Sequence, residues 1–208
     1  MYRLYGDKGS GAAMVEAALA EIGEPYEFVR VDLSLNEQQA GDYRRLNSAK
    51  KIPALELEDG TLLTESAAIL HYLGEQHAGA KLLPPPRTTA RANTMRWLIY
   101  VVAEIYPLIE MRDYPGRFIN GEKTQRLLQS RAIVRLRERW LIVEVAITGL
   151  PWLGAEGISV ADLAIGCVSR WAIGREWRLQ NCPKIEAINA AIVARPLAGP
   201  VWQRHFDL

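Results

Sequence analysis

Three short segments of the sequence carry residue types that could bind an anionic ligand. The first is Thr64-Glu65-Ser66, which opens a predicted helix. Serine is a preferred N-cap residue, and the first backbone N–H groups of a helix have no partner within it. The helix dipole adds positive potential there, so a ligand carboxylate is expected to bind. An acidic Glu65 suits a ligand that also carries an ammonium group. The alternative interpretation of Ser66 is a plain capping residue.

The second segment is Ile52-Pro53, directly before a predicted strand. A cis bond at this proline would turn the backbone N–H and C=O of Ile52 outward, where they could pair with a peptide ligand as an added strand does. An ordinary trans proline at the start of a strand is the competing interpretation.

The third segment is the glycine-rich turn at residues 5–11, YGDKGSG. Its glycines allow the backbone to approach a ligand closely. Ser10 lies near the start of the next predicted helix, where its hydroxyl and the helix dipole would both stabilise a ligand thiolate. Such a site lowers the pKa of a thiol from about 8.5 toward neutrality. Tyr5 is a second, lower-ranked donor, and a capping role is the alternative for Ser10.

Residues 1–77 contain the elements that must position these segments. A strand at 2–5, a helix at 10–22 and a strand at 26–31 form a βαβ unit. A short helix at 42–46 and strands at 52–57 and 61–63 follow, and Asp59-Gly60 marks the hairpin turn. A helix begins at Ser66. The order βαβαββα predicts a thioredoxin-like α+β domain.

Residues 78–87 contain three consecutive prolines and are predicted to be an extended linker. The remainder, 88–208, is predicted to be an all-α helical bundle. Pro107 is expected to kink its first long helix. Further helices are predicted at 122–147 and 160–171, and a last one at 184–194 ends before Pro196.

Charge and composition exclude several classes of function. Residues 1–77 carry seven Lys/Arg against thirteen Asp/Glu, whereas the rest carries eighteen against eleven, which is typical of a domain boundary. Arg131, Arg135 and Arg139 are expected to form a solvated helix face rather than a nucleic-acid surface, with attraction of an anionic ligand as the alternative. The sequence shows no membrane span, secretory signal or zinc-type spacing, and its two cysteines, Cys167 and Cys182, form no disulfide framework. We expect a cytoplasmic protein without a metal.

The chain resembles the cytosolic glutathione transferases over nearly its whole length. The matching pieces are LYGDKGSG near the start, LNSAKKIPAL at 46–55, TESAAILHYL at 64–73 and ISVADLAIGCVSRWA at 158–172. Ser159 and Asp162 in the last piece have capping-box spacing, and we expect a structural role for them. Bacterial beta-class members resemble the chain most, but they carry a cysteine where Ser10 stands. Their mixed-disulfide chemistry is therefore not expected here.

The resemblance implies a glutathione site on the first domain. The γ-glutamyl group would meet Glu65 and Ser66, and the cysteinyl backbone would pair with Ile52, which precedes Pro53. Lys51 could reach the glycyl carboxylate, with Lys50 as an equal rival. The sulfur would lie at Ser10, with Tyr5 as the other candidate.

A pocket for the second substrate is also implied, formed by Gly11, Tyr106, Ile109 and Arg112. Tyr106 stands where beta-class members carry a histidine, and an ordinary buried tyrosine is the alternative. Arg112 could attract an anionic co-substrate or be a simple surface residue.

The resemblance predicts a homodimeric enzyme that activates the thiol of glutathione, its co-substrate, for attack on a small, hydrophobic electrophile. Glutathione-dependent isomerisation, dehalogenation or ether cleavage would use the same thiol site. A non-catalytic glutathione-binding module with the same fold is the alternative from another class. Nucleic acid and membranes are not expected partners.

Overall fold

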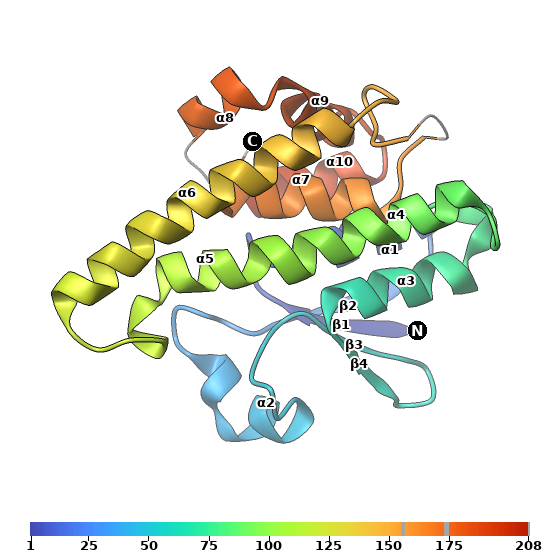
Figure 1. Ribbon diagram of the computed structural model, residues 1–208. Coiled ribbons are helices and arrows are strands. Elements are labelled where there is room, and N and C mark those ends of the chain that lie inside the picture. Colours follow the sequence, from blue (N-terminus) through green and yellow to red (C-terminus); the bar gives the residue numbers. More distant parts are fainter. Residues whose placement is uncertain (155–156, 173–174, 208) are drawn as a thin grey trace. The chain divides into compact units, whose positions relative to one another are not determined.

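A four-stranded mixed sheet organises the N-terminal part of the chain in the computed structural model, which describes residues 1–154, 157–172 and 175–207 (Figure 1). The strands are β1 (Tyr2–Gly6), β2 (Tyr26–Arg30), β3 (Ala54–Glu56) and β4 (Leu62–Thr64), in the order β2-β1-β3-β4. β1 is parallel to β2 and antiparallel to β3, which is antiparallel to β4. The predicted thioredoxin-like arrangement is confirmed.

The two faces of the sheet are covered by different helices. Leu4 and Leu55 face each other in register, are fully buried, and lie on the side of α1 (Ala12–Ile22) and α3 (Ser66–Gln76). Side chains alternate along a strand, so Tyr5 points to the other face. There its ring lies 6.0 Å from that of Tyr43 in α2 (Gly41–Leu46). The direction of each side chain of β1 thus follows from its position in the strand.

Helix α1 ends where the sequence predicts. Gly23 adopts the left-handed conformation, with φ of 80°, and its N–H donates to the carbonyls of Leu19 and Ala20. Glycine takes this conformation without the steric cost of a Cβ. The chain then returns to β2, which completes the parallel crossover.

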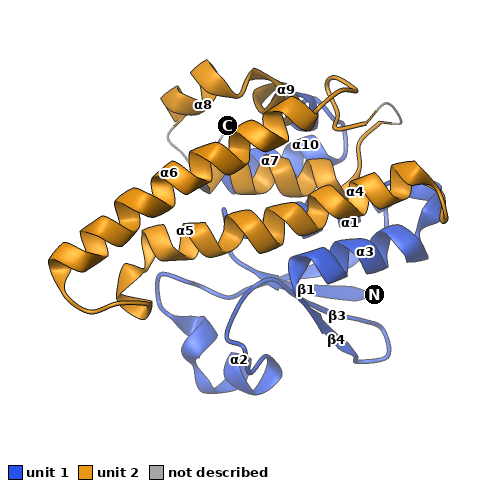
Figure 2. Cartoon of the chain, in the orientation of Figure 1, with its two compact units in different colours: residues 1–83, 191–208 blue, residues 84–190 orange. Residues whose placement is uncertain are grey.

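The described chain divides into two compact units (Figure 2). Unit 1 comprises residues 1–83 and 191–208, and unit 2 comprises residues 84–190. The domain boundaries predicted from the sequence, 1–77 and 88–208, stay a prediction. In the structure, residues 191–208 group with unit 1 rather than with the helical unit 2. None of the described helices is long and apolar enough to cross a membrane.

Helix α10 (Ala198–Phe206) belongs to unit 1 and packs against α1. The Glu21 carboxylate of α1 accepts two bonds from the Arg195 guanidinium, at 2.8 and 2.6 Å, and one from the Ala198 N–H at 3.1 Å. The prediction that the helix at 184–194 is the last one was therefore wrong. Pro200 falls in the first turn of α10, where its missing N–H has no helical partner to lose.

Unit 2 is helical, as the sequence predicts. Its elements are α4 (Thr89–Tyr100), the π-helical segment η3 (Val101–Ile105), α5 (Tyr106–Asp113), α6 (Glu122–Ala146), α7 (Val160–Ala172), α8 (Arg175–Asn181) and the first part of α9 (Pro183–Val193). Short 3-10 turns lie at η1 (Glu37–Gln39) and η2 (Ala78–Ala80) in unit 1 and at η4 (Pro115–Arg117) in unit 2. Pro107 lies two residues after the π segment, in the first turn of α5, and it offers no N–H to continue the regular ladder.

The predicted capping box opens α7. Asp162 is fully buried, and its carboxylate accepts bonds from the Ser159 N–H at 2.8 Å, the Ser159 hydroxyl at 2.6 Å and the Leu153 N–H at 2.7 Å. Burial raises the pKa of Asp162 to about 6, although these bonds oppose the rise. The role is structural, as expected.

Candidate functional site

The strand register brings the three predicted segments to one end of the sheet. Ala54 at the start of β3 pairs with Tyr5 near the end of β1 and with Thr64 at the end of β4. The turn after β1, the Ile52-Pro53 segment before β3 and the Glu65-Ser66 segment after β4 therefore leave the sheet at the same edge. All three segments belong to unit 1.

Open backbone donors and an exposed carboxylate lie at the start of α3. The first intrahelical bond runs from the Ile69 N–H to the Glu65 carbonyl, so the N–H groups of residues 66–68 have no partner among the described residues. Ser66 is the first helical residue, 9% exposed, and Glu65 occupies the capping position. The prediction that Ser66 is the N-cap was thus wrong by one residue.

Glu65 has an unusual backbone conformation, with φ of 66°. Such a conformation costs a non-glycine residue about 1–3 kcal/mol and tends to occur at functional sites. The Glu65 carboxylate is exposed and makes no hydrogen bond or ion pair with any described residue. A carboxylate that can bind a cation and several N–H groups that can bind an anion therefore lie side by side. This arrangement suits a ligand group with both an ammonium and a carboxylate.

The Ile52-Pro53 bond is cis. Neither the N–H nor the C=O of Ile52 pairs with another described residue. The preceding loop is anchored at the Lys51 carbonyl, which accepts bonds from the Tyr43 hydroxyl at 2.7 Å and the Asn47 side-chain amide at 2.8 Å. The Lys51 side chain is exposed, and Lys50 has φ of 55°.

Sequence reasoning missed Tyr43 and Asn47. Both are buried polar residues that hold the loop through backbone atoms. The asparagine in LNSAKKIPAL was a usable signal, because its amide can satisfy backbone groups of a nearby turn.

Ser10 lies at the centre of the turn after β1. Its hydroxyl donates to the Asp7 carbonyl at 2.7 Å and accepts from the N–H groups of Ala12 at 3.2 Å and Asp7 at 3.3 Å. The capping position of α1 is Gly11, whose N–H has no partner among the described residues. A thiolate at this turn would thus find an open N–H at Gly11 and a serine hydroxyl that must turn away from Asp7.

The Tyr5 hydroxyl is directed elsewhere. It donates to the Glu56 carboxylate at 2.7 Å, on the face of the sheet opposite Leu4. Burial and this bond raise the pKa of Tyr5, which keeps the phenol protonated. Its donor hydrogen is therefore already committed, and Ser10 is the better-supported of the two candidates.

Three residues predicted to line a second-substrate pocket lie in unit 2. Tyr106 packs edge to face against Trp171, with ring centroids 5.5 Å apart. Ile109 is only 7% exposed and contributes to the core of this unit. The Arg112 guanidinium binds both carboxylate oxygens of Asp113, at 2.7 and 2.9 Å, which neutralises much of its charge.

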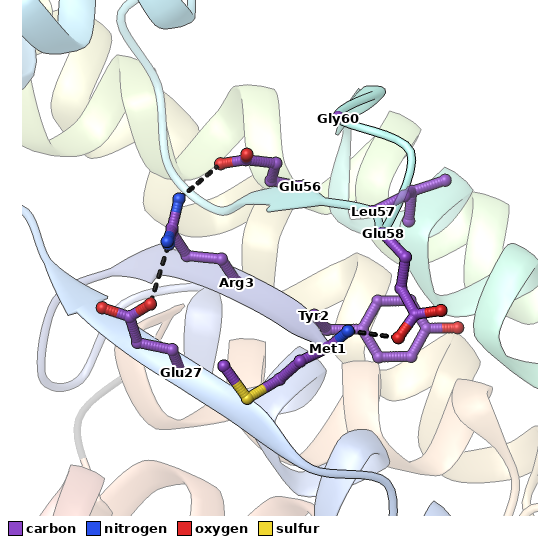
Figure 3. A pocket seen from close by; sticks show the side chains of 8 residues that line it. All are labelled: Met1, Tyr2, Arg3, Glu27, Glu56, Leu57, Glu58 and Gly60. Atoms are coloured by element: carbon purple, nitrogen blue, oxygen red, sulfur yellow. Dashed lines mark hydrogen bonds and ion pairs between the residues drawn. The ribbon is translucent and has the colours of Figure 1, made fainter.

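A surface pocket lies at the other end of β1 (Figure 3). Arg3 there bridges Glu27 and Glu56, and the N-terminal amine pairs with Glu58. These charges already satisfy one another. The register places this pocket away from the Ser10 turn, so it is not part of the candidate site.

The Asp7 carboxylate, also missed by sequence reasoning, braces the first half of the Ser10 turn. It accepts bonds from the N–H groups of Lys8 and Leu33, both at 2.9 Å, and from the Arg30 guanidinium at 3.2 Å. Asp7 is visible in YGDKGSG, but its distant partners, Arg30 at the end of β2 and Leu33 beyond it, gave no local signal.

Comparisons with known proteins agree with this geometry. The model of the glutathione S-transferase N-terminal domain family matches residues 2–75. Glutathione S-transferase GstA of Escherichia coli O157:H7 is 29% identical over 199 residues, covering 93% of this chain and 94% of that protein.

Solved structures extend the likeness to the whole fold. A glutathione transferase homologue from Sulfitobacter, with bound glutathione, has a TM-score of 0.88 at 27% identity and covers 99% of both chains. A beta-class glutathione S-transferase of Sphingomonas chungbukensis has a TM-score of 0.79 at 23% identity over 97% of both chains, which shows the fold alone. The resemblance predicted from the sequence is confirmed: residues 2–75 match the glutathione S-transferase N-terminal domain family, and the chain has the glutathione transferase fold.

Proposed function

We propose that this protein is a glutathione transferase that binds glutathione along residues 52–66 and activates its thiol at the Ser10 turn. The observation that carries the proposal is the convergence of three sets of polar groups at one edge of the sheet. These are the Ile52 backbone groups, the first N–H groups of α3 with the Glu65 carboxylate, and the turn at Ser10 and Gly11.

Each part of the tripeptide matches one of these sets. The γ-glutamyl ammonium would pair with Glu65, and its carboxylate would bind Ser66 and the N–H groups at the start of α3. The cysteinyl backbone would pair with Ile52, next to cis Pro53, as a short added strand. Lys51, or else Lys50, would meet the glycyl carboxylate. The glutathione bound in the Sulfitobacter homologue supports this ligand.

The proposed chemistry is nucleophilic attack by the glutathione sulfur. The thiol loses its proton to solvent, and the thiolate is stabilised by the Ser10 hydroxyl and the Gly11 N–H at the positive end of α1. A sulfur lone pair then forms the C–S bond with an electrophilic carbon. In a substitution the leaving group departs with its bonding pair, and in an addition the adjacent carbon takes up a proton.

The second substrate is proposed to be a small, hydrophobic electrophile that meets the sulfur beside Gly11; among the other contact residues that the resemblance implies, Tyr106 is the foremost candidate. Because Ile109 is buried and Arg112 is paired with Asp113, these two are weaker candidates for direct contact. A homodimer in the cytoplasm is expected from the family resemblance.

Two measurements on the purified full chain test the proposal. Calorimetric titration with glutathione should show binding, and a general aryl halide electrophile should be consumed with formation of the glutathione conjugate. Binding without turnover across a broad panel of electrophiles would favour a non-catalytic module. No binding of glutathione would refute the proposal.

A further inference from the structure

A histidine far along the chain contacts the turn that carries Ser10. The Gly9 N–H donates to Nδ1 of His205 at 3.1 Å, across 196 positions of sequence. His205 lies in α10 and is 5% exposed. Gly9 has φ of 69°, and its N–H belongs to the Lys8–Gly9 peptide, one residue before Ser10. The orientation of this peptide therefore depends on a side chain from α10, within unit 1.

The bond at Gly9 determines which nitrogen of His205 carries the proton. A backbone N–H can only donate, so Nδ1 must be unprotonated and the hydrogen of the neutral ring must lie on Nε2. Nε2 lies 2.6 Å from the Glu16 carboxylate of α1, which accepts this hydrogen. The ring thus accepts from the turn on one side and donates to α1 on the other.

Glu16 is itself held firmly. It is 2% exposed, and its other oxygen accepts from the Tyr26 hydroxyl at 2.9 Å and from Arg204. Burial acts to raise the pKa of Glu16, but the bonds from His205, Arg204 and Tyr26 outweigh it and keep the pKa below its ordinary value. Glu16 is therefore a carboxylate that locks the His205 ring in orientation and in proton position.

The two halves of the turn have different supports. Asp7 holds the first half through Lys8, Arg30 and Leu33. Towards Ser10, the bond from the Gly9 N–H to His205 is a side-chain support that comes from another element, α10. The ion pair between Lys8 and Asp207 also joins the turn to the end of α10, but both side chains are more than half exposed and it adds little.

We propose that His205 is a positioning residue for thiol activation: by accepting the Gly9 N–H it sets the Lys8–Gly9 peptide, one residue before Ser10, and so directs the hydroxyl and the Gly11 N–H toward the sulfur. This inference rests on the proposed function. Small misplacements of groups around a reacting atom are costly, up to about a hundredfold in rate for about 1 Å. The effect should therefore appear in kcat more than in the KM for glutathione, whose main contacts lie at residues 52–66.

A matched pair of substitutions separates the two bonds of the ring. His205→Asn retains an amide oxygen near the position of Nδ1, which can accept from Gly9, but loses the donor to Glu16. His205→Gln retains an amide N–H near the position of Nε2, which can donate to Glu16, but loses the acceptor for Gly9. Asp207→Asn is the control, because it removes the exposed link between α10 and the turn.

The readouts are kcat and KM with the aryl halide, the pKa of bound glutathione from its thiolate ultraviolet absorbance, and urea unfolding. We expect His205→Gln to lower kcat about tenfold or more and to raise the pKa of the bound thiol, with a smaller change in KM. His205→Asn should retain most of kcat even if it is less stable, and Asp207→Asn should match the wild type.

The inference is overturned if both His205 variants lose kcat in proportion to their loss of stability, since that pattern indicates a merely structural role. If the wild type binds glutathione without turnover, the catalytic part of the proposed function is refuted. The pKa of the bound thiol in the wild type and the variants would still test the role of His205. If the wild type fails to bind glutathione, both proposals fall together.

Discussion

The replacement Ser10→Ala tests the proposed activation of the thiol, and its size can be worked from the bonds around Ser10. In the structure the hydroxyl donates to the Asp7 carbonyl at 2.7 Å. To stabilise a thiolate, it must give up this neutral bond for a charged one. A hydrogen bond to a charged group contributes about 1.5–3 kcal/mol, and a neutral one about 0.5–1.5 kcal/mol.

The difference, about 1 kcal/mol, is the net stabilisation of the thiolate that the alanine variant would lose. It corresponds to a rise of somewhat less than one unit in the pKa of the bound thiol and to a loss of about fivefold in kcat. The Gly11 N–H and the dipole of α1 remain in the variant. We therefore expect a reduced but measurable rate, with a smaller change in glutathione affinity.

The assay is the pH dependence of thiolate absorbance in the glutathione complex, together with kcat for the aryl halide. Ser10→Thr is the matched control, because it retains a hydroxyl that can accept from Ala12 and donate to the sulfur. Urea unfolding of both variants accounts for the loss of the acceptor for the Ala12 N–H. An unchanged thiol pKa and full activity in Ser10→Ala would refute the assignment, and loss of activity in Tyr5→Phe alone would transfer it to Tyr5.

Three further outcomes are expected. Ser66→Ala should weaken glutathione binding about tenfold or more in a calorimetric titration, since the bound carboxylate loses a hydroxyl donor worth about 1.5–3 kcal/mol; unchanged affinity would contradict the placement of the γ-glutamyl group. Tyr5→Phe should lower the midpoint of urea unfolding more than it lowers kcat, because the lost bond is to Glu56 rather than to the ligand; a loss confined to kcat would argue otherwise. Asp162 should make folding depend on pH: its pKa of about 6 in the folded state lies above the ordinary 3.8, so the folded state binds the proton more tightly. The resulting stabilisation is complete below pH 3.8 and is lost as the pH rises through 6, by about 3 kcal/mol. Asp162→Asn, which cannot titrate, should remove this part of the pH dependence in urea unfolding curves, and identical slopes in both proteins would show that Asp162 does not titrate in this range.

Local patterns were sufficient to predict the sheet and most helices. The βαβ unit and the hairpin at Asp59-Gly60 have strong alternation and turn residues, and their register was then enough to bring the candidate segments together. The start of α3 at Ser66 was also predictable, although Glu65 rather than Ser66 occupies the capping position. The helix after Pro196 was not predicted; Pro200 lies in the first turn of α10, where proline is tolerated.

Contacts that join distant parts of the chain could not be predicted. The bond between Gly9 and His205 spans 196 positions, and no periodicity or motif links the two residues. The direction of Tyr5, by contrast, was available from strand alternation, since its neighbour Leu4 faces the core. The hydropathy of the residues on either side of a candidate donor in a strand thus indicates which face of the sheet its side chain occupies.

The return of α10 to unit 1 has a consequence for how the protein is made. Synthesis proceeds from the N-terminus, so residues 1–83 leave the ribosome long before residues 191–208 that complete the same unit. Until then Glu16 and Glu21 have no partner from α10, and the Gly9 amide has no acceptor there. The nascent N-terminal segment therefore exposes the surface that α10 later covers until unit 2 and residues 191–208 have been translated. A fusion or truncation within residues 191–208 would therefore disturb unit 1, whose first 83 residues are synthesised first, rather than unit 2.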